Sequence, residues 1–212
     1  MLIFLRKQFI TYIRANVVSY FFIILIFVIG IALGSLAAKA LPGEQKIELI
    51  NYLNVFFEGL ISNDKNLIDT QSAFWSVLLN NVKTLGLIFI LGFTIIGMPF
   101  ILFIILMRGF IIGFTVGFLV NEFVFKGLLF AALAVLPHNF LLVPVFLATA
   151  VSAITFSLML LKQRGNLQKG LLYNASVYSL FFLCSLLVTI VASLIEVYIS
   201  PSLMKLAVKL FM

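Results

Sequence analysis

The feature that most constrains this chain is a series of long apolar runs with almost no charge. Residues 17–38 contain no charged residue, and residues 84–120 contain only Arg108. About 20 apolar residues in a helix cross roughly 30 Å of hydrocarbon. With 64% hydrophobic and 10% charged residues, the chain cannot cover a water-soluble domain with polar side chains. The sequence therefore predicts an all-α fold, a polytopic membrane helix bundle, as one membrane domain over residues 1–212.

Breaks within these runs predict about five transmembrane helices, one of them short and one broken. Pro99 predicts a kink in the second helix, because proline removes a backbone donor. Arg108 marks the predicted start of the third, whose 14 residues rise only about 21 Å. Pro137 interrupts the next run, so a piece over 123–136 either spans, lies on the interface or is re-entrant. The predicted spans are residues 17–38, 84–107, 108–121, 140–161 and 171–193.

The longest polar stretch, residues 44–83, holds five of the seven acidic residues and is expected to lie outside the bilayer core. Within it, Leu53, Phe56 and Phe57 belong to an apolar series at three- and four-residue spacing. This spacing predicts one face of an amphipathic helix, which packs against lipid headgroups or protein. We expect this external helical segment to present a partner-docking face.

Basic residues indicate the orientation of the chain. The formal net charge of +7 comes from residues scattered between apolar runs, which favours topology signals over a nucleic-acid surface. In the five-span prediction, all four arginines fall on one side, which is therefore predicted to be cytoplasmic. The N-terminus is then cytoplasmic, and the C-terminus and residues 44–83 are external. The residues on the predicted inner side are Arg6, Lys7, Arg14, Arg108, Lys162, Arg164 and Lys169.

Two patterns of small residues predict close helix packing. Gly109, Gly113 and Gly117 form a doubled GxxxG pattern, and Gly30 and Gly34 form a single one. Glycines four residues apart allow two helix backbones to approach closely. The spacing fits packing inside the bundle, or alternatively a contact with a second copy of the chain in a homo-oligomer.

His138 is the only histidine, and it follows Pro137 at a break in an apolar run, where polar groups are costly and often functional. It is the best single site candidate, although a structural role, in which it satisfies carbonyls freed at the break, is the favoured explanation. It has no neighbouring acid, nucleophile or metal ligand in the sequence. We therefore expect no enzyme activity, catalytic residues, metal or cofactor. Arg108 and Glu122 are expected to reach opposite membrane interfaces.

The layout of spans and short motifs resembles the stage II sporulation protein M family over nearly the whole chain. Where some wider relatives carry a glycine and then an acidic residue after the Pro-His pair, this chain has Asn139 and an apolar run, which favours the sporulation branch. The motifs are Asn51-Tyr52-Leu53-Asn54-Val55-Phe56-Phe57, Asn80-Asn81-Val82-Lys83, Arg108-Gly109 and Leu136-Pro137-His138-Asn139 with Pro144.

The resemblance implies a membrane component of the engulfment complex in sporulation, at the septal or engulfing membrane. It implies a non-enzymatic scaffold that recruits two peptidoglycan-degrading partners, the stage II sporulation proteins D and P, a wall transglycosylase and an amidase. A membrane subunit of a transporter or permease is the alternative, because broken helices often frame a substrate path. That alternative predicts a polar cavity at membrane depth.

Overall fold

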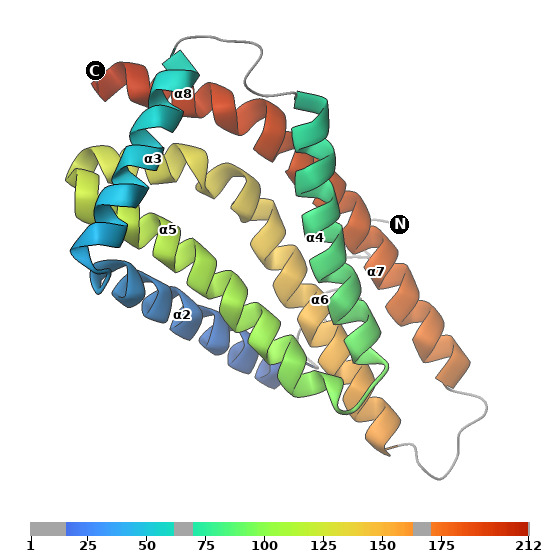
Figure 1. The fold of residues 1–212 in the computed structure, drawn as a ribbon. Helices are drawn as coiled ribbons and strands as arrows, with labels where there is room; N and C mark the ends of the chain where they lie inside the picture. The colour runs from blue at the N-terminus through green and yellow to red at the C-terminus, as the bar shows by residue number, and fades with distance from the viewer. Residues whose placement is uncertain (1–15, 62–69, 163–170, 212) are drawn as a thin grey trace.

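The computed structural model describes residues 16–61, 70–162 and 171–211, and this part of the chain is helical without strands, so the predicted all-α class is confirmed. Within these described ranges, five helices are long and apolar enough to cross a membrane, which confirms the predicted number. The elements in Figure 1 are α2 (Val17–Lys39), α3 (Gly43–Ile61), α4 (Thr70–Gly92), α5 (Gly97–Ala134), α6 (Leu136–Lys162), α7 (Leu171–Leu194), the π-helical η1 (Ile195–Ile199) and α8 (Ser200–Phe211).

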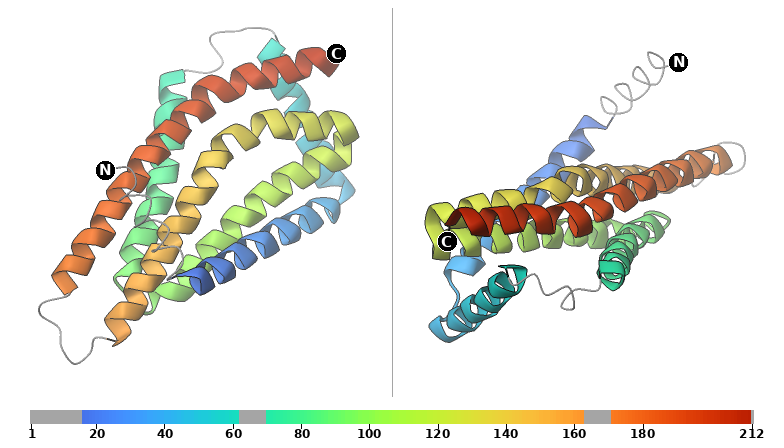
Figure 2. Two further views of the ribbon diagram at one scale, coloured as in Figure 1. Left: turned by 180° about the vertical axis from the view of Figure 1, so that it is seen from behind. Right: turned by 90° about the horizontal axis from the view of Figure 1, so that it is seen from above.

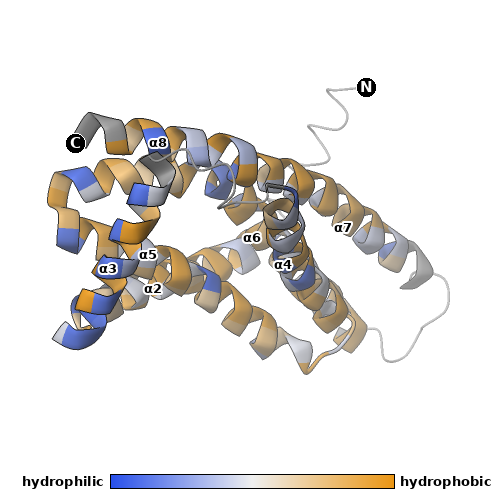
Figure 3. Cartoon of the chain, turned by 45° about the horizontal axis from the view of Figure 1, so that its top comes forward, coloured by the Kyte–Doolittle hydropathy of each residue, from blue (hydrophilic) through white to orange (hydrophobic). Residues whose placement is uncertain are grey.

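The helices run between two ends of an elongated bundle. The start of α2, the turn at residues 93–96, the end of α6 and the start of α7 lie at one end, here called the turn end (Figure 1). The opposite end, called the α3 end, holds α3, α8 and the bend in α5, as both views in Figure 2 show. In Figure 3, α7 is largely hydrophobic, whereas hydrophilic residues are frequent on α3.

The second predicted span is placed wrongly. Instead of one kinked helix over residues 84–107, α4 ends at Gly92 and α5 begins at Gly97. Pro99 therefore lies in the first turn of α5, where a missing N–H costs no intrahelical hydrogen bond. The intervening turn is fixed from α6, since the Ser157 hydroxyl donates a hydrogen bond of 2.9 Å to the Thr94 carbonyl. The spanning helix now starts near Gln71, so the segment 44–83 is divided between α3 and the first half of α4.

The short third span over residues 108–121 is also wrong, because Arg108 lies inside one continuous helix that begins at Gly97. The break comes at Val124, whose φ of 48° and ψ of −118° are non-helical. A short helix over 125–134 then turns back toward α6 at the α3 end (Figure 1). The predicted break near Pro137 is present two residues earlier, at Val135, the C-cap between α5 and α6.

Val124 is strained, and this gives a testable consequence. Its backbone angles match the first central position of a type II′ turn, which strongly favours glycine. The side chain is 71% exposed, so its removal loses little packing. We expect Val124→Gly to raise the free energy of unfolding by about 1 kcal/mol, measured by thermal unfolding in detergent. The matched control is Val55→Gly, which is 69% exposed within a regular helix and should be slightly destabilising.

The two glycine patterns meet each other inside this chain, along the contact between α2 and α5. We call this contact the glycine seam. A Cβ atom added at Gly34 would collide with the backbone of α5, and one added at Gly113 would collide with the backbone of α2. The two backbones touch because no side chain separates them. The seam consists of Gly30 and Gly34 on α2 and Gly109, Gly113 and Gly117 on α5.

The turn-end half of the bundle is a close-packed apolar core. Its fully buried side chains come from α2, α4, α5, α6 and α7, and aromatic rings of α4, α6 and α7 stack beside them. The Tyr178 hydroxyl donates a hydrogen bond of 3.0 Å to the Phe89 carbonyl, which ties α7 to α4. This half therefore leaves little room for solvent. The fully buried residues include Leu85, Ile88, Ile101, Ile105, Ala150 and Val151.

A polar cavity at the α3 end

The α3-end half of the bundle contains a partly open cavity of about 580 Å³, in contrast to the dense turn-end half. Helices α3, α4, α5 and α6 contribute to its walls, together with η1 and α8. The volume is within the range of ligand pockets, roughly 300–1,000 Å³, and apolar residues supply most of the lining. Its polar lining residues are Asn80, Asn81, Thr84, Arg108, Thr115, His138, Asn139 and Glu196.

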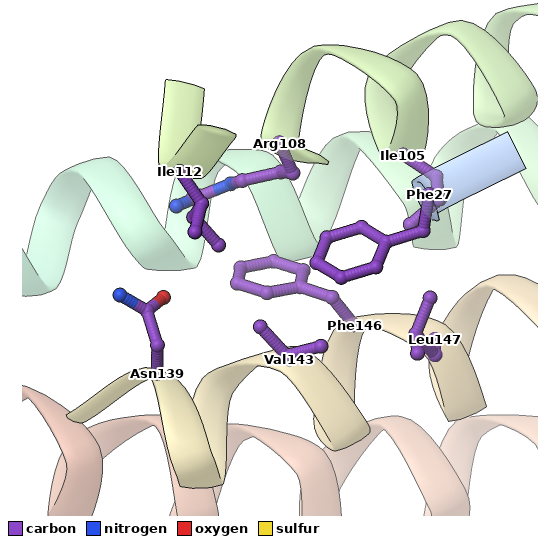
Figure 4. A pocket seen from close by; sticks show the side chains of 8 residues that line it. All are labelled: Phe27, Ile105, Arg108, Ile112, Asn139, Val143, Phe146 and Leu147. Atoms are coloured by element: carbon purple, nitrogen blue, oxygen red, sulfur yellow. The ribbon is translucent and has the colours of Figure 1, made fainter. Parts of the chain in front are cut away.

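Arg108 is the central charged group of this site. Its Nη2 atom donates hydrogen bonds of 3.1 Å to the Asn81 side-chain oxygen and of 3.1 Å to the Thr84 hydroxyl. Asn81 and Thr84 are three residues apart on α4, so they lie on one helix face. The guanidinium carbon lies 4.3 Å from the centre of the Phe146 ring, a cation–π contact. Figure 4 shows Arg108 extended across Phe146, with Asn139 of α6 lining the same small pocket.

His138 lies in the first turn of α6, where the chain resumes after the break at Val135. The Asn139 amide nitrogen donates to the Val135 carbonyl at 2.8 Å and lies 3.0 Å from His138 Nε2. Since the amide nitrogen is a donor, Nε2 is the acceptor and the ring proton is on Nδ1. His138 Nδ1 is buried without a hydrogen-bond partner among the described residues. The histidine therefore satisfies no freed carbonyl through that atom. Pro137 occupies the same first turn, which tolerates it.

Glu196 brings a negative charge to the cavity from η1, directly after α7. Short π-helical segments within α-helices occur frequently at functional sites. Within the part of the chain that the structure describes, its carboxylate forms neither an ion pair nor a hydrogen bond, although Arg108 and His138 line the same space. The site thus holds one cation and one anion that are not paired with each other.

Glu122 is the second acidic residue near the α3 end, and its position differs from the prediction. It does not extend alone to an interface, because its carboxylate forms an ion pair of 2.8 Å with the Lys46 ammonium. Lys46 belongs to α3 and Glu122 to the end of the first part of α5. Arg108 does not extend to an interface either, since its partners are on α4 and α6. The ion pair fixes the start of α3 against the bend in α5.

The predicted docking residues of α3 differ in exposure. Leu53 points inward, where it lines the cavity and packs against the apolar cluster of Phe130 and Ala207. Phe56, three residues further along the helix, is 37% exposed, and the side chain of Phe57 lies outside the described residues. Instead, the outward apolar side chains of α3 are Ile47, Tyr52, Val55 and Phe56, here called the α3 outer face.

Sequence reasoning did not find Asn81, Thr84 or Glu196 as site residues. The signal available for the first two was a lone arginine in an apolar run, together with an amide and a hydroxyl three residues apart where that run begins. No sequence pattern around Glu196 indicated that it belongs to the site. In the described ranges there is no group of three His, Cys, Asp or Glu residues placed to hold a metal ion.

Fold and site together define a polytopic helical membrane protein with a polar cavity near one end of its bundle. A comparison with protein families finds a match over residues 23–201 to the family described as stage II sporulation protein M. The chain belongs to this family and is a sporulation-related membrane protein. No curated protein and no solved structure matches the chain.

Proposed function

We propose that this protein is a non-enzymatic membrane scaffold that recruits peptidoglycan-degrading enzymes during engulfment. The observation that carries the proposal is the α3 outer face. Tyr52 is 75% exposed and Val55 is 69% exposed on a helix that does not belong to the membrane-spanning set. Exposed aromatic and aliphatic side chains gathered on a helix are typical of protein interaction sites. The proposed partners are the stage II sporulation proteins D and P, at the septal or engulfing membrane.

The position of α3 supports this role, because the helix is fixed at its inner side. The Lys46–Glu122 ion pair joins it to α5, and Leu53 packs into the cluster formed by α5 and α8. A surface held by a rigid support loses less conformational freedom on binding than a mobile one. The partners would then cleave the peptidoglycan, and this chain would localise them at the membrane.

The docking face is tested by replacing Tyr52, Val55 and Phe56 together with serine. We expect at least a tenfold loss of co-purification of the two wall enzymes with unchanged membrane insertion, since anchors at an interface each contribute more than about 1 kcal/mol. The matched control replaces Tyr198 and Leu206, which are 56% and 55% exposed at η1 and α8. Undiminished co-purification by the triple variant would exclude this face. Leu53→Ser is unsuitable, because it damages the inner packing.

The proposal also requires α3 to be external, with the N-terminus in the cytoplasm and the C-terminus outside. Arg108 no longer counts as a loop charge. Of the other predicted inner residues, Lys162 ends α6 at the turn end, and the rest lie outside the described residues. In a Cys184→Ser background, cysteines placed at Gln45 and Lys205 should react with a membrane-impermeant thiol reagent on intact cells. A cysteine at Gly165 should react only after permeabilisation. The reverse pattern would place α3 in the cytoplasm and remove the proposed meeting with wall enzymes.

The alternative of a transporter subunit finds partial support in the cavity, whose polar lining includes His138. A transport route must continue to the other side of the membrane. Toward the turn end, however, the next residues along the same helices are fully buried, including Leu85 on α4 and Ile105 on α5. The cavity is thus closed in that direction. This geometry favours a binding cavity over a conducting path.

A further inference from the structure

The cavity at the α3 end combines features that together specify a ligand. It presents an arginine and a glutamate that are not paired with each other, and an apolar wall in a membrane-spanning bundle. We infer that this cavity binds the headgroup of a zwitterionic phospholipid, with the phosphate on Arg108 and the ammonium on Glu196. This assignment is independent of the scaffold function, because it concerns a ligand on the opposite side of α3 from the outer face.

Arg108 is suited to a phosphate because much of its donor capacity is unused. Both hydrogen bonds that it makes to described residues leave from Nη2, whereas a guanidinium carries five N–H donors on three nitrogens. Asn81, Thr84 and Phe146 hold the group in place before any ligand arrives. A planar guanidinium fixed in this way matches the paired oxygens of a phosphate.

Glu196 explains why the ligand should also carry a positive charge. A phosphate alone in this cavity would face the Glu196 carboxylate, and a like charge in a site of low dielectric is unfavourable. A primary ammonium supplies three donors to the carboxylate, which accepts none from the described residues. His138 lines the same cavity, and its buried Nδ1 atom has no hydrogen-bond partner among the described residues. The charges of site and ligand are then complementary.

The apolar part of the cavity wall fits a lipid. Arg108 and Glu196 lie inside the spanning helices Gly97–Ala134 and Asn174–Val208, and His138 lies in the first turn of α6. Most of the remaining wall is apolar, including Ile111, Phe118 and Leu119 of α5. An acyl chain can occupy such a wall, whereas a free ion or a small polar solute gains nothing from it.

The test uses the full chain purified in detergent and freed of lipid, with binding followed by native mass spectrometry. Phosphatidylethanolamine and phosphatidylglycerol with identical acyl chains are compared, because only the first carries an ammonium. We expect wild-type protein to bind phosphatidylethanolamine at least tenfold more tightly, equivalent to about 1.4 kcal/mol. Glu196→Gln keeps the side-chain size and should abolish this preference. Glu58→Gln, at an exposed position of α3 outside the cavity lining, should retain it.

Three results would overturn the assignment. Equal affinity of wild-type protein for the two lipids would show that no ammonium is recognised. A preference that persists in Glu196→Gln would place the recognition elsewhere on the protein. Binding of soluble glycerophosphoethanolamine as tightly as the lipid would identify a water-soluble zwitterion as the occupant, because the apolar wall would then contribute nothing.

Discussion

Gly113→Ala is expected to reduce the free energy of unfolding by about 3 kcal/mol, at the upper end of the range for overpacked sites. The added methyl group would meet the backbone of Ile31, including its carbonyl oxygen and Cα atom. Backbone atoms cannot rotate away as a side-chain tip can, so α2 and α5 must separate along the whole glycine seam. The measurement is the thermal midpoint in detergent, together with the fraction of protein that elutes as a single species.

Gly86→Ala provides the matched control in α4. A Cβ atom at this position has no neighbour within 4 Å, so the same methyl group meets open space. Alanine also favours the helix over glycine by up to about 1 kcal/mol, so this variant should be neutral or slightly stabilised. If Gly113→Ala were as stable as Gly86→Ala, α2 and α5 would not be in backbone contact at this position.

Arg108→Lys is expected to lower the free energy of unfolding by about 2 kcal/mol, although it preserves the charge. Lysine retains the cost of placing a cation among helices but loses the planar group that lies on Phe146 and donates to two oxygens on α4. The opposite exchange at an exposed helix end, Lys39→Arg, should change stability by less than about 0.5 kcal/mol.

A double-mutant cycle measures how much the hydrogen bond between Arg108 and Asn81 contributes to stability, apart from the other effects of each substitution. Asn81→Ala removes one of the two acceptors, so its effect should be smaller in the Arg108→Lys background than in the wild type. The coupling free energy between the two sites is the quantity to measure by unfolding in detergent. Strictly additive effects would mean that the hydrogen bond between Arg108 and Asn81 contributes nothing to stability.

Hydropathy alone predicted the fold class, the number of spans and the bounds of several helices. The first predicted span, 17–38, differs from α2 by one residue, and the last, 171–193, differs from α7 by one residue. The first run is apolar almost throughout, so α2 ends where that run ends, whereas α7 continues directly into η1 and α8. Their position required no knowledge of neighbours.

The second and third spans were misplaced because their polar residues satisfy each other. Asn81 made the start of α4 look external, and Arg108 looked like a helix boundary, yet the two side chains are hydrogen-bonded in the folded bundle. A single sequence does not distinguish polar residues that pair between helices from those that face water. The bend at Val124 had no signal either, because a β-branched residue is disfavoured at positive φ. Of the cavity, only His138 was a site candidate from sequence.

The glycine seam also sets an order for assembly in the cell. Gly34 and Gly113 are 79 residues apart in the chain, the difference of their numbers. At a synthesis rate of about 5–20 residues per second, Gly113 of α5 is synthesised roughly 4–16 seconds after Gly34 of α2. During that time the glycine surface of α2 has no partner helix within its own chain. A helix of another chain that is being synthesised nearby can pack against it instead. Crowded translation should therefore favour mispaired copies, and α3 can reach its final place only after α5 has arrived.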